Sequence, residues 1–189
     1  FDRRKGQNVV ISPVILQNSV IEIVPKYKYL GVVIDEKLNW VEQSKHFLAK
    51  GHIRLHFLRK LKSFHVDKTI LKLFYTAVVE STILYGCLYW YCRLRKCDQT
   101  KIQRLLNQAG KIVGENFSLD YICSVRGLKK VENIMKNPQH PLHPCFCWMR
   151  SGKRLQSAKC RTNSYLNSFI PFAIRAFNTH VNFNWCRSI

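Results

Sequence analysis

Histidine and cysteine side chains form the densest group of potential metal ligands in this sequence. His140, His143, Cys145 and Cys147 place four nitrogen and sulfur donors within eight residues. Such donors bind zinc, but structural zinc sites usually separate two ligand pairs by a longer loop, and prolines stiffen the backbone between these donors. We therefore predict no metal here and interpret the two cysteines as small core residues, with a zinc site as the alternative.

Positive charge is the other feature that points to chemistry. The 189 residues include 31 Lys and Arg against 11 Asp and Glu, which gives a net charge of +20 and a pI near 9.9. Residues 44–189 hold nearly all of the excess, and no acidic residue follows Glu132. A field of this sign attracts polyanions, so we expect nucleic acid as the partner and neither a small-molecule substrate nor a cofactor.

Composition bounds the class of protein. Hydrophobic residues make up 47% of the chain and aromatic residues 12%, which is enough to bury a core. The eight cysteines follow no regular spacing, so free thiols in a reducing compartment are expected, and hence an intracellular location, nuclear or cytoplasmic. The chain begins with Phe1 and no signal-peptide pattern follows, so we interpret it as a piece of a longer protein.

The first 40 residues predict strands. Val9–Ile11 and Val20–Val24 are short β-branched runs separated by turn residues, and Tyr29–Ile34 is a third apolar run. We expect them to form a small antiparallel sheet.

From residue 41 onward, apolar residues recur at helical spacing. Helices are expected over residues 44–62, from an Asp67 N-cap onward, from Asp98 onward, over Leu119–Met135 and over Tyr165–His180, with an irregular basic stretch at 137–163. The apolar positions expected on the buried faces of the first three are Leu48, Leu55, Leu58 and Leu61; Ile70, Leu71, Phe74, Ala77 and Val78; and Ile102, Leu105, Leu106, Ala109, Ile112 and Val113.

One apolar segment has the length of a membrane-spanning helix. Residues 73–92 lie between Lys72 and Arg93 and carry a single charge, Glu80. A carboxylate near the centre of a bilayer is costly. We therefore predict a buried helix of a bundle and no membrane partner.

A series of short motifs, in order along the chain, resembles one protein family. These are Lys28-Tyr29-Leu30-Gly31-Val32, Leu38-Asn39-Trp40, Leu58-Arg59-Lys60-Leu61, Ala109-Gly110-Lys111-Ile112-Val113, Ser151-Gly152-Lys153-Arg154 and Arg161-Thr162-Asn163. Together they resemble the palm end, thumb and post-thumb region of reverse transcriptases from non-LTR (LINE-type) retrotransposons. The resemblance spans essentially the whole chain.

This resemblance implies roles for particular residues. Lys28, Tyr29, Leu30 and Gly31 would form a hairpin like the primer grip, which supports the primer end. Basic side chains of the thumb and post-thumb region would hold RNA, DNA or an RNA–DNA hybrid through phosphate contacts. These are Lys50, Arg54, Arg59, Lys60, Lys101, Arg104, Lys111, Lys153, Arg154 and Arg161.

The catalytic part of such a polymerase is missing from this sequence. The family binds Mg²⁺ on a Tyr-x-Asp-Asp turn, and the chain has no Asp-Asp pair. We therefore predict a non-catalytic fragment, with Mg²⁺ needed only by a full-length parent.

The post-thumb region also resembles what some family models describe as the N-terminal part of an AlkB-type tRNA dioxygenase–methyltransferase. That label implies an Fe(II) site of the His-x-Asp…His type, and His65-Val66-Asp67 has the first half of it, with His140, His143 or His180 downstream. However, Asp67 is better explained as a helix N-cap. A methyltransferase would need a glycine-rich turn after a strand, which is absent. We therefore keep this enzyme as the alternative and expect neither activity.

The predicted fold class is α+β, mainly α. A short antiparallel sheet remnant would occupy residues 1–40, a thumb-like helical bundle residues 41–136, and an irregular basic post-thumb region residues 137–189.

Overall fold

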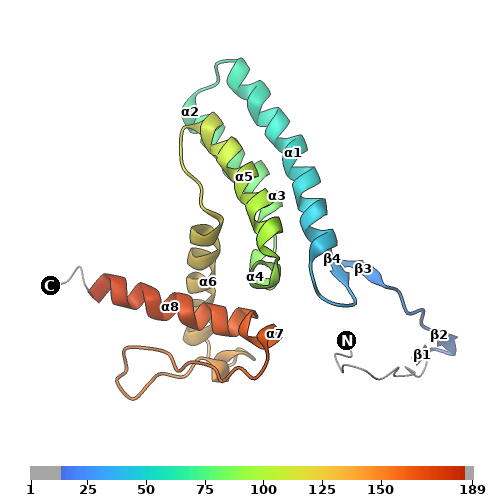
Figure 1. The fold of residues 1–189 in the computed structure, drawn as a ribbon, viewed down its shortest axis with the longest axis vertical. Helices are drawn as coiled ribbons and strands as arrows, with labels where there is room; N and C mark the ends of the chain where they lie inside the picture. The colour runs from blue at the N-terminus through green and yellow to red at the C-terminus, as the bar shows by residue number, and fades with distance from the viewer. Residues whose placement is uncertain (1–13, 186–189) are drawn as a thin grey trace.

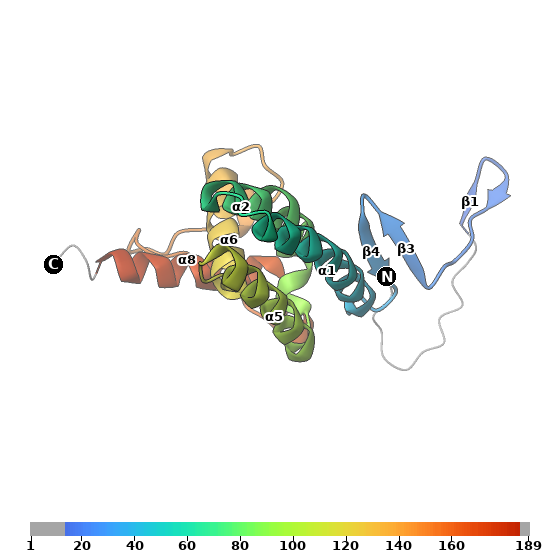
Figure 2. The same ribbon diagram turned by 90° about the horizontal axis from the view of Figure 1, so that it is seen from above.

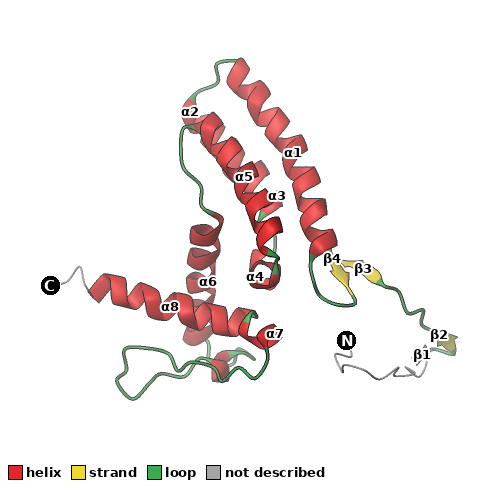
Figure 3. Ribbon diagram, viewed as in Figure 1, coloured by secondary structure: helices red, strands yellow, loops and turns green. Residues whose placement is uncertain are grey.

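The computed structural model describes residues 14–185 and confirms an α+β fold that is mainly helical (Figure 3). The strands all lie near the N-terminus: β1 (Ile15–Leu16), β2 (Ser19–Val20), β3 (Lys26–Tyr29) and β4 (Val32–Asp35). The helices are α1 (Val41–Ser63), α2 (Lys68–Phe74), the π-helix η1 (Tyr75–Glu80), α3 (Ser81–Ile83), α4 (Cys87–Trp90), the 3₁₀ turn η2 (Tyr91–Arg93), α5 (Lys96–Val113), α6 (Leu119–Lys136), the 3₁₀ turn η3 (His143–Cys145), α7 (Asn163–Leu166) and α8 (Phe169–Trp185).

The strands form two separate antiparallel hairpins, β1–β2 and β3–β4, where one small sheet was expected. The expected run Tyr29–Ile34 is not one strand, because Leu30 and Gly31 turn the chain with φ angles of 46° and 81°. Glycine adopts this left-handed region without a steric penalty. Of the expected strand Val20–Val24 only Val20 belongs to a strand, although the Ile21 N–H still donates a hydrogen bond to the Val14 carbonyl oxygen; Val9–Ile11 lies outside the described residues.

Helices α1 and α5 lie side by side and run in the same direction, with α2, η1 and α3 returning between their ends (Figures 1 and 2). The helix expected at residues 44–62 is confirmed and is slightly longer. Its predicted face is buried as expected: Leu55 and Leu58 are inaccessible, while Leu48 and Leu61 pack against the same core.

The second predicted helix begins as expected, because the Asp67 side chain accepts a hydrogen bond from the Thr69 N–H. Its predicted face is partly wrong. Ile70 and Ala77 are exposed, whereas the buried side chains recur every four residues: Leu71, Tyr75, Val79 and Ile83. The π-helix η1 causes this shift, since its wider turn moves the buried stripe relative to a 3.6-residue period.

The stretch Lys68–Arg93 is long and apolar enough to cross a membrane by length and composition alone. It is not one continuous α-helix, because η1 interrupts it and Gly86 adopts a left-handed conformation. Its only acidic residue, Glu80, forms an ion pair of 2.7 Å with Arg126 of α6. The absence of a membrane partner stays a prediction.

The ends of the remaining helices differ in how well they were predicted. Asp98 does not cap α5: the helix begins at Lys96, and Asp98 lies buried in its first turn. The start of α6 is predicted correctly, with Ser118 as its N-cap, and the helix ends one residue later than expected. The C-terminal helix is split in two, because Asn167 and Ser168 separate α7 from α8.

Two hydrophobic cores hold the described chain together. The larger core is formed by α1 to α5 and the first half of α6, which contributes Leu119 and Cys123. The smaller core joins the second half of α6 to α8 and to the irregular segment between them, through Val131, Ile174 and Leu155. The domain boundaries expected near residues 40 and 136 stay predictions.

Candidate nucleic-acid interface

Three of the predicted basic residues share the outward face of α5. Lys101, Arg104 and Lys111 are exposed and are spaced three and seven residues apart, which places them on one side of a helix. The opposite side of α5 is buried in the larger core. The periodicity of the apolar residues predicts this division correctly.

Helix α1 adds two basic side chains beside this stripe. The Arg59 guanidinium donates a hydrogen bond of 3.0 Å to Gln108 Oε1, and Lys62 Nζ donates one of 3.3 Å to the Lys111 carbonyl oxygen. We call the surface formed by Arg59, Lys62, Lys101, Arg104 and Lys111 the α1/α5 face. Lys62 is not among the residues predicted from the sequence, although its spacing from Arg59 places both near the same side of a helix.

The other predicted phosphate-binding residues lie elsewhere. Lys50 is about 180° around α1 from Arg59 at 100° per residue, and Arg54 is on that far side too. Lys60 points about 100° away from Arg59. Lys153, Arg154 and Arg161 belong to the exposed segment between α6 and α7. The ten predicted residues therefore do not form a single surface.

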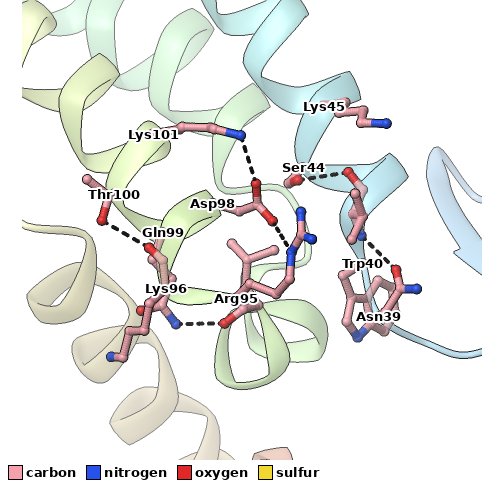
Figure 4. A network of polar contacts seen from close by, with 12 residues as sticks. Asn39, Trp40, Ser44, Lys45, Arg95, Lys96, Asp98, Gln99, Thr100 and Lys101 are labelled. Carbon is pink, nitrogen blue, oxygen red and sulfur yellow. Dashed lines mark hydrogen bonds and ion pairs between the residues drawn. The ribbon is translucent and has the colours of Figure 1, made fainter.

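The buried carboxylate of Asp98 lies at the N-terminal end of α5, beside Lys101 of the α1/α5 face (Figure 4). Asp98 is only 2% exposed and accepts hydrogen bonds from Arg95 Nε at 2.8 Å and from Lys101 Nζ at 3.3 Å. Burial alone would raise the pKa of this carboxyl, but the two hydrogen bonds and positive charges outweigh it and hold the pKa below its usual value. Asp98 thus offsets part of the charge of Lys101.

The substitution Asp98→Asn is expected to lower the free energy of unfolding by about 1–2 kcal/mol at pH 7, because charge-assisted hydrogen bonds are lost at a partly screened site. A folded-state pKa below the unfolded value stabilises the protein above the unfolded pKa, and this stabilisation is lost as pH falls through the folded pKa. The difference between wild type and variant should therefore vanish in acid. Urea denaturation at pH 7 and near pH 2 measures this.

The exposed Glu132→Gln variant is the control, with an expected change within about 0.5 kcal/mol at either pH. A constant difference for Asp98→Asn across pH would contradict the role of its charge.

The four residues with the primer-grip-like prediction lie together at the β3–β4 hairpin. Leu30 and Gly31 form its turn, and Lys28 and Tyr29 end β3. The turn approaches the α3–α4 region, and beside it a groove of about 550 Å³ is lined by Tyr29, Tyr85 and other largely apolar side chains. The hairpin is present, while its role toward a primer stays a prediction.

The comparison with family models gives a match to a segment of this helical region. Residues 43–81 match the model described as "Alkylated DNA repair protein alkB homolog 8, N-terminal". The match runs from the first turn of α1 to the start of α3, about a fifth of the chain. The likeness was expected in the post-thumb region, residues 137–189, and that placement is wrong. No curated protein and no solved structure matches the chain, and none of the comparisons supports a reverse transcriptase.

The histidine and cysteine residues do not assemble into a metal site within residues 14–179. No group of three or more His, Cys, Asp or Glu side chains there is arranged to hold a metal ion. Instead, His140 Nδ1 accepts a hydrogen bond from the Leu142 N–H. Cys145 and Cys147 are exposed, so the interpretation as core residues is wrong: Phe146 between them is buried.

The residues present do not fit the Fe(II) site that an AlkB-type enzyme would need. The Asp67 carboxylate caps α2, and its bond to Thr69 lowers the pKa of the carboxyl. His65 lies in a left-handed turn before it. No part of the described chain is therefore assigned to iron chemistry.

Proposed function

We propose that this chain is a nucleic-acid-binding module without catalytic activity of its own, and that the α1/α5 face holds the phosphate backbone of RNA, DNA or an RNA–DNA hybrid. The observation that supports this proposal is the positive charge of the α1/α5 face. Among the described residues, no carboxylate pairs with Arg59, Lys62, Arg104 or Lys111. Basic side chains along two parallel helices can follow a backbone without reading its sequence.

Two kinds of parent protein are candidates. An AlkB-type tRNA-modifying enzyme is supported by the family-model match over residues 43–81, which includes Arg59 and Lys62. A LINE-type reverse transcriptase is supported by the ordered motifs of the sequence, and there the module would hold the template and primer. In both, the catalytic residues would lie outside this chain, and nucleic acid would be the partner.

The test is binding of the chain to a labelled RNA–DNA hybrid and to a tRNA, measured by fluorescence anisotropy over a range of salt concentrations. The triple variant Arg59→Gln, Arg104→Gln, Lys111→Gln is expected to bind on the order of 100-fold more weakly near 0.1 M salt. The slope of log affinity against log salt should fall by about 2–3, because each lost phosphate contact removes nearly one released counterion.

The matched control removes the same charge from the exposed side of α6, with Lys129→Gln, Lys130→Gln and Lys136→Gln. Equal losses in the two triple variants would mean that net charge alone is responsible, and no binding by the wild-type chain at low salt would refute the proposal. Preference for tRNA favours the first parent, and preference for the hybrid favours the second.

A further inference from the structure

A second basic site lies at the N-terminal end of α1, away from the α1/α5 face. The β3–β4 hairpin and the first turns of α1 line an open pocket of about 560 Å³. Lys26 and Lys28 of β3 line one side of it, and Glu42, Lys45 and His46 of α1 line the other. We call this the hairpin pocket.

The charge of the hairpin pocket is positive. Its acid, Glu42, is paired with Lys45 at 2.7 Å, and this bond lowers the pKa of the Glu42 carboxyl. Lys26 and Lys28 have no ion-pair partner among the described residues. Asp35 lies opposite Lys26 in the hairpin but forms no ion pair with it. Its carboxylate instead accepts hydrogen bonds from three backbone N–H groups.

Two buried polar groups beside the pocket lack partners. Gln43 is 1% exposed; its Oε1 accepts a hydrogen bond from the N–H of Val33, which lines the pocket, and its Nε2 has no partner. The His46 Nε2 is also buried without a partner. Buried polar groups are nearly always satisfied, so such exceptions call for an explanation. The Gln43 amide thus lacks an acceptor, but Gln43 does not line the pocket and neither nitrogen is exposed to it.

We propose that the hairpin pocket binds a phosphate group. Phosphate supplies the negative charge and the oxygen acceptors for the ammonium groups of Lys26 and Lys28, which line the pocket and have no ion-pair partner among the described residues. The phosphate can belong to a nucleic-acid backbone, in which case the inference rests on the proposed function, or it can be a free phosphate.

The pocket and the α1/α5 face lie on different sides of α1, because His46, like Lys50, is far around the helix from Arg59 (about 140° at 100° per residue). His46 and Arg59 are thirteen residues apart on α1, which is about 20 Å along the helix axis. Figure 1 shows the hairpin at one end of α1 and the top of the α1/α5 face at the other.

The test follows the imidazole resonances of His46 by NMR while a phosphate source is added. Burial, and then the positive charges of Lys50 and Lys28, lower the pKa of His46, so the bound anion acts on a neutral ring near pH 7. The probes are inorganic phosphate and, separately, a 12-base-pair RNA–DNA hybrid. A saturable shift with inorganic phosphate indicates a site for free phosphate, and a shift with the hybrid alone indicates a phosphodiester site; either supports the proposal.

The double variant Lys26→Gln, Lys28→Gln should weaken this response about tenfold or more, because two cationic contacts are lost. The control Lys129→Gln, Lys130→Gln should leave it unchanged. No shift with either probe, or an unchanged response in the Lys26/Lys28 variant, would overturn the proposal. The triple variant of the α1/α5 face separates the two ideas: if it still responds to inorganic phosphate, the pocket stands even where the proposed function fails.

Discussion

Replacing Trp90 with alanine is expected to lower the free energy of unfolding by about 3–5 kcal/mol, the range for deleting a large buried aromatic side chain. Trp90 is 1% exposed in the larger core, and its ring centroid lies 5.4 Å from that of Phe47 on α1. Its indole N–H donates a hydrogen bond of 2.9 Å to the Tyr85 carbonyl oxygen. Alanine would leave both a cavity and an unpaired carbonyl. Chemical denaturation followed by circular dichroism measures the change.

The same substitution at Trp148 is the matched control, because that side chain is 46% exposed; a loss within about 1 kcal/mol is expected. Since the total stability of a small domain is about 5–15 kcal/mol, the alanine variant at Trp90 can fail to fold. The milder variant Trp90→Phe can then be measured instead. Its expected loss of unfolding free energy lies between those of Trp90→Ala and Trp148→Ala. Equal losses at Trp90 and Trp148 would contradict the placement of the core.

The sequence predicts those helices whose buried stripe follows a regular period and whose ends carry standard signals. Helix α6 illustrates this, because Ser118 caps its start and its apolar residues keep to one face. Helix α1 is predicted from its buried stripe alone, because its N-cap, Trp40, makes no side-chain capping hydrogen bond. Local physics decides these elements, so local patterns identify them.

The errors in the predicted fold arise where the backbone leaves regular geometry. The left-handed Leu30 in the hairpin turn has no sequence signal, since leucine rarely adopts a positive φ. The π-helix η1 moves the buried stripe to Tyr75 and Val79, which a 3.6-residue period cannot anticipate. Asp98 has the residue type of an N-cap, but two cations satisfy its charge inside the helix.

The candidate sites were predictable to different degrees. Arg104 and Lys111 lie opposite a buried stripe, so their exposure follows from one helix. Which side of α1 joins them depends on how α1 packs against α5, and this separates Arg59 from Lys50. The hairpin pocket depends on contacts between β3, β4 and α1, and the buried Gln43 beside it carries no sequence pattern at all.

The substitution Gly110→Ala is expected to destabilise the protein by about 2–3 kcal/mol, even though alanine is the better helix former by about 1 kcal/mol. The chain after α5 folds back so closely that an added Cβ at Gly110 would lie 2.3 Å from the Glu115 carbonyl oxygen. The Gly110 carbonyl also accepts the N–H groups of Gly114 and Glu115, which close the end of the helix. Backbone atoms cannot rotate away as a side chain can, so this end of α5 has to open.

Opening it would also disturb the connection to α6. Phe117 in that connection stacks on Tyr75 with ring centroids 4.0 Å apart, and its carbonyl oxygen accepts a hydrogen bond of 2.7 Å from Gln103. Denaturation in urea, with tyrosine absorbance in the near ultraviolet, should therefore show lower stability together with a changed aromatic environment. Cys97→Ala, at an exposed position of the same helix, is the control and should stay within about 0.5 kcal/mol of wild type. If Gly110→Ala were as stable as that control, helix propensity would outweigh the contact and the close approach of the two backbone segments would be wrong.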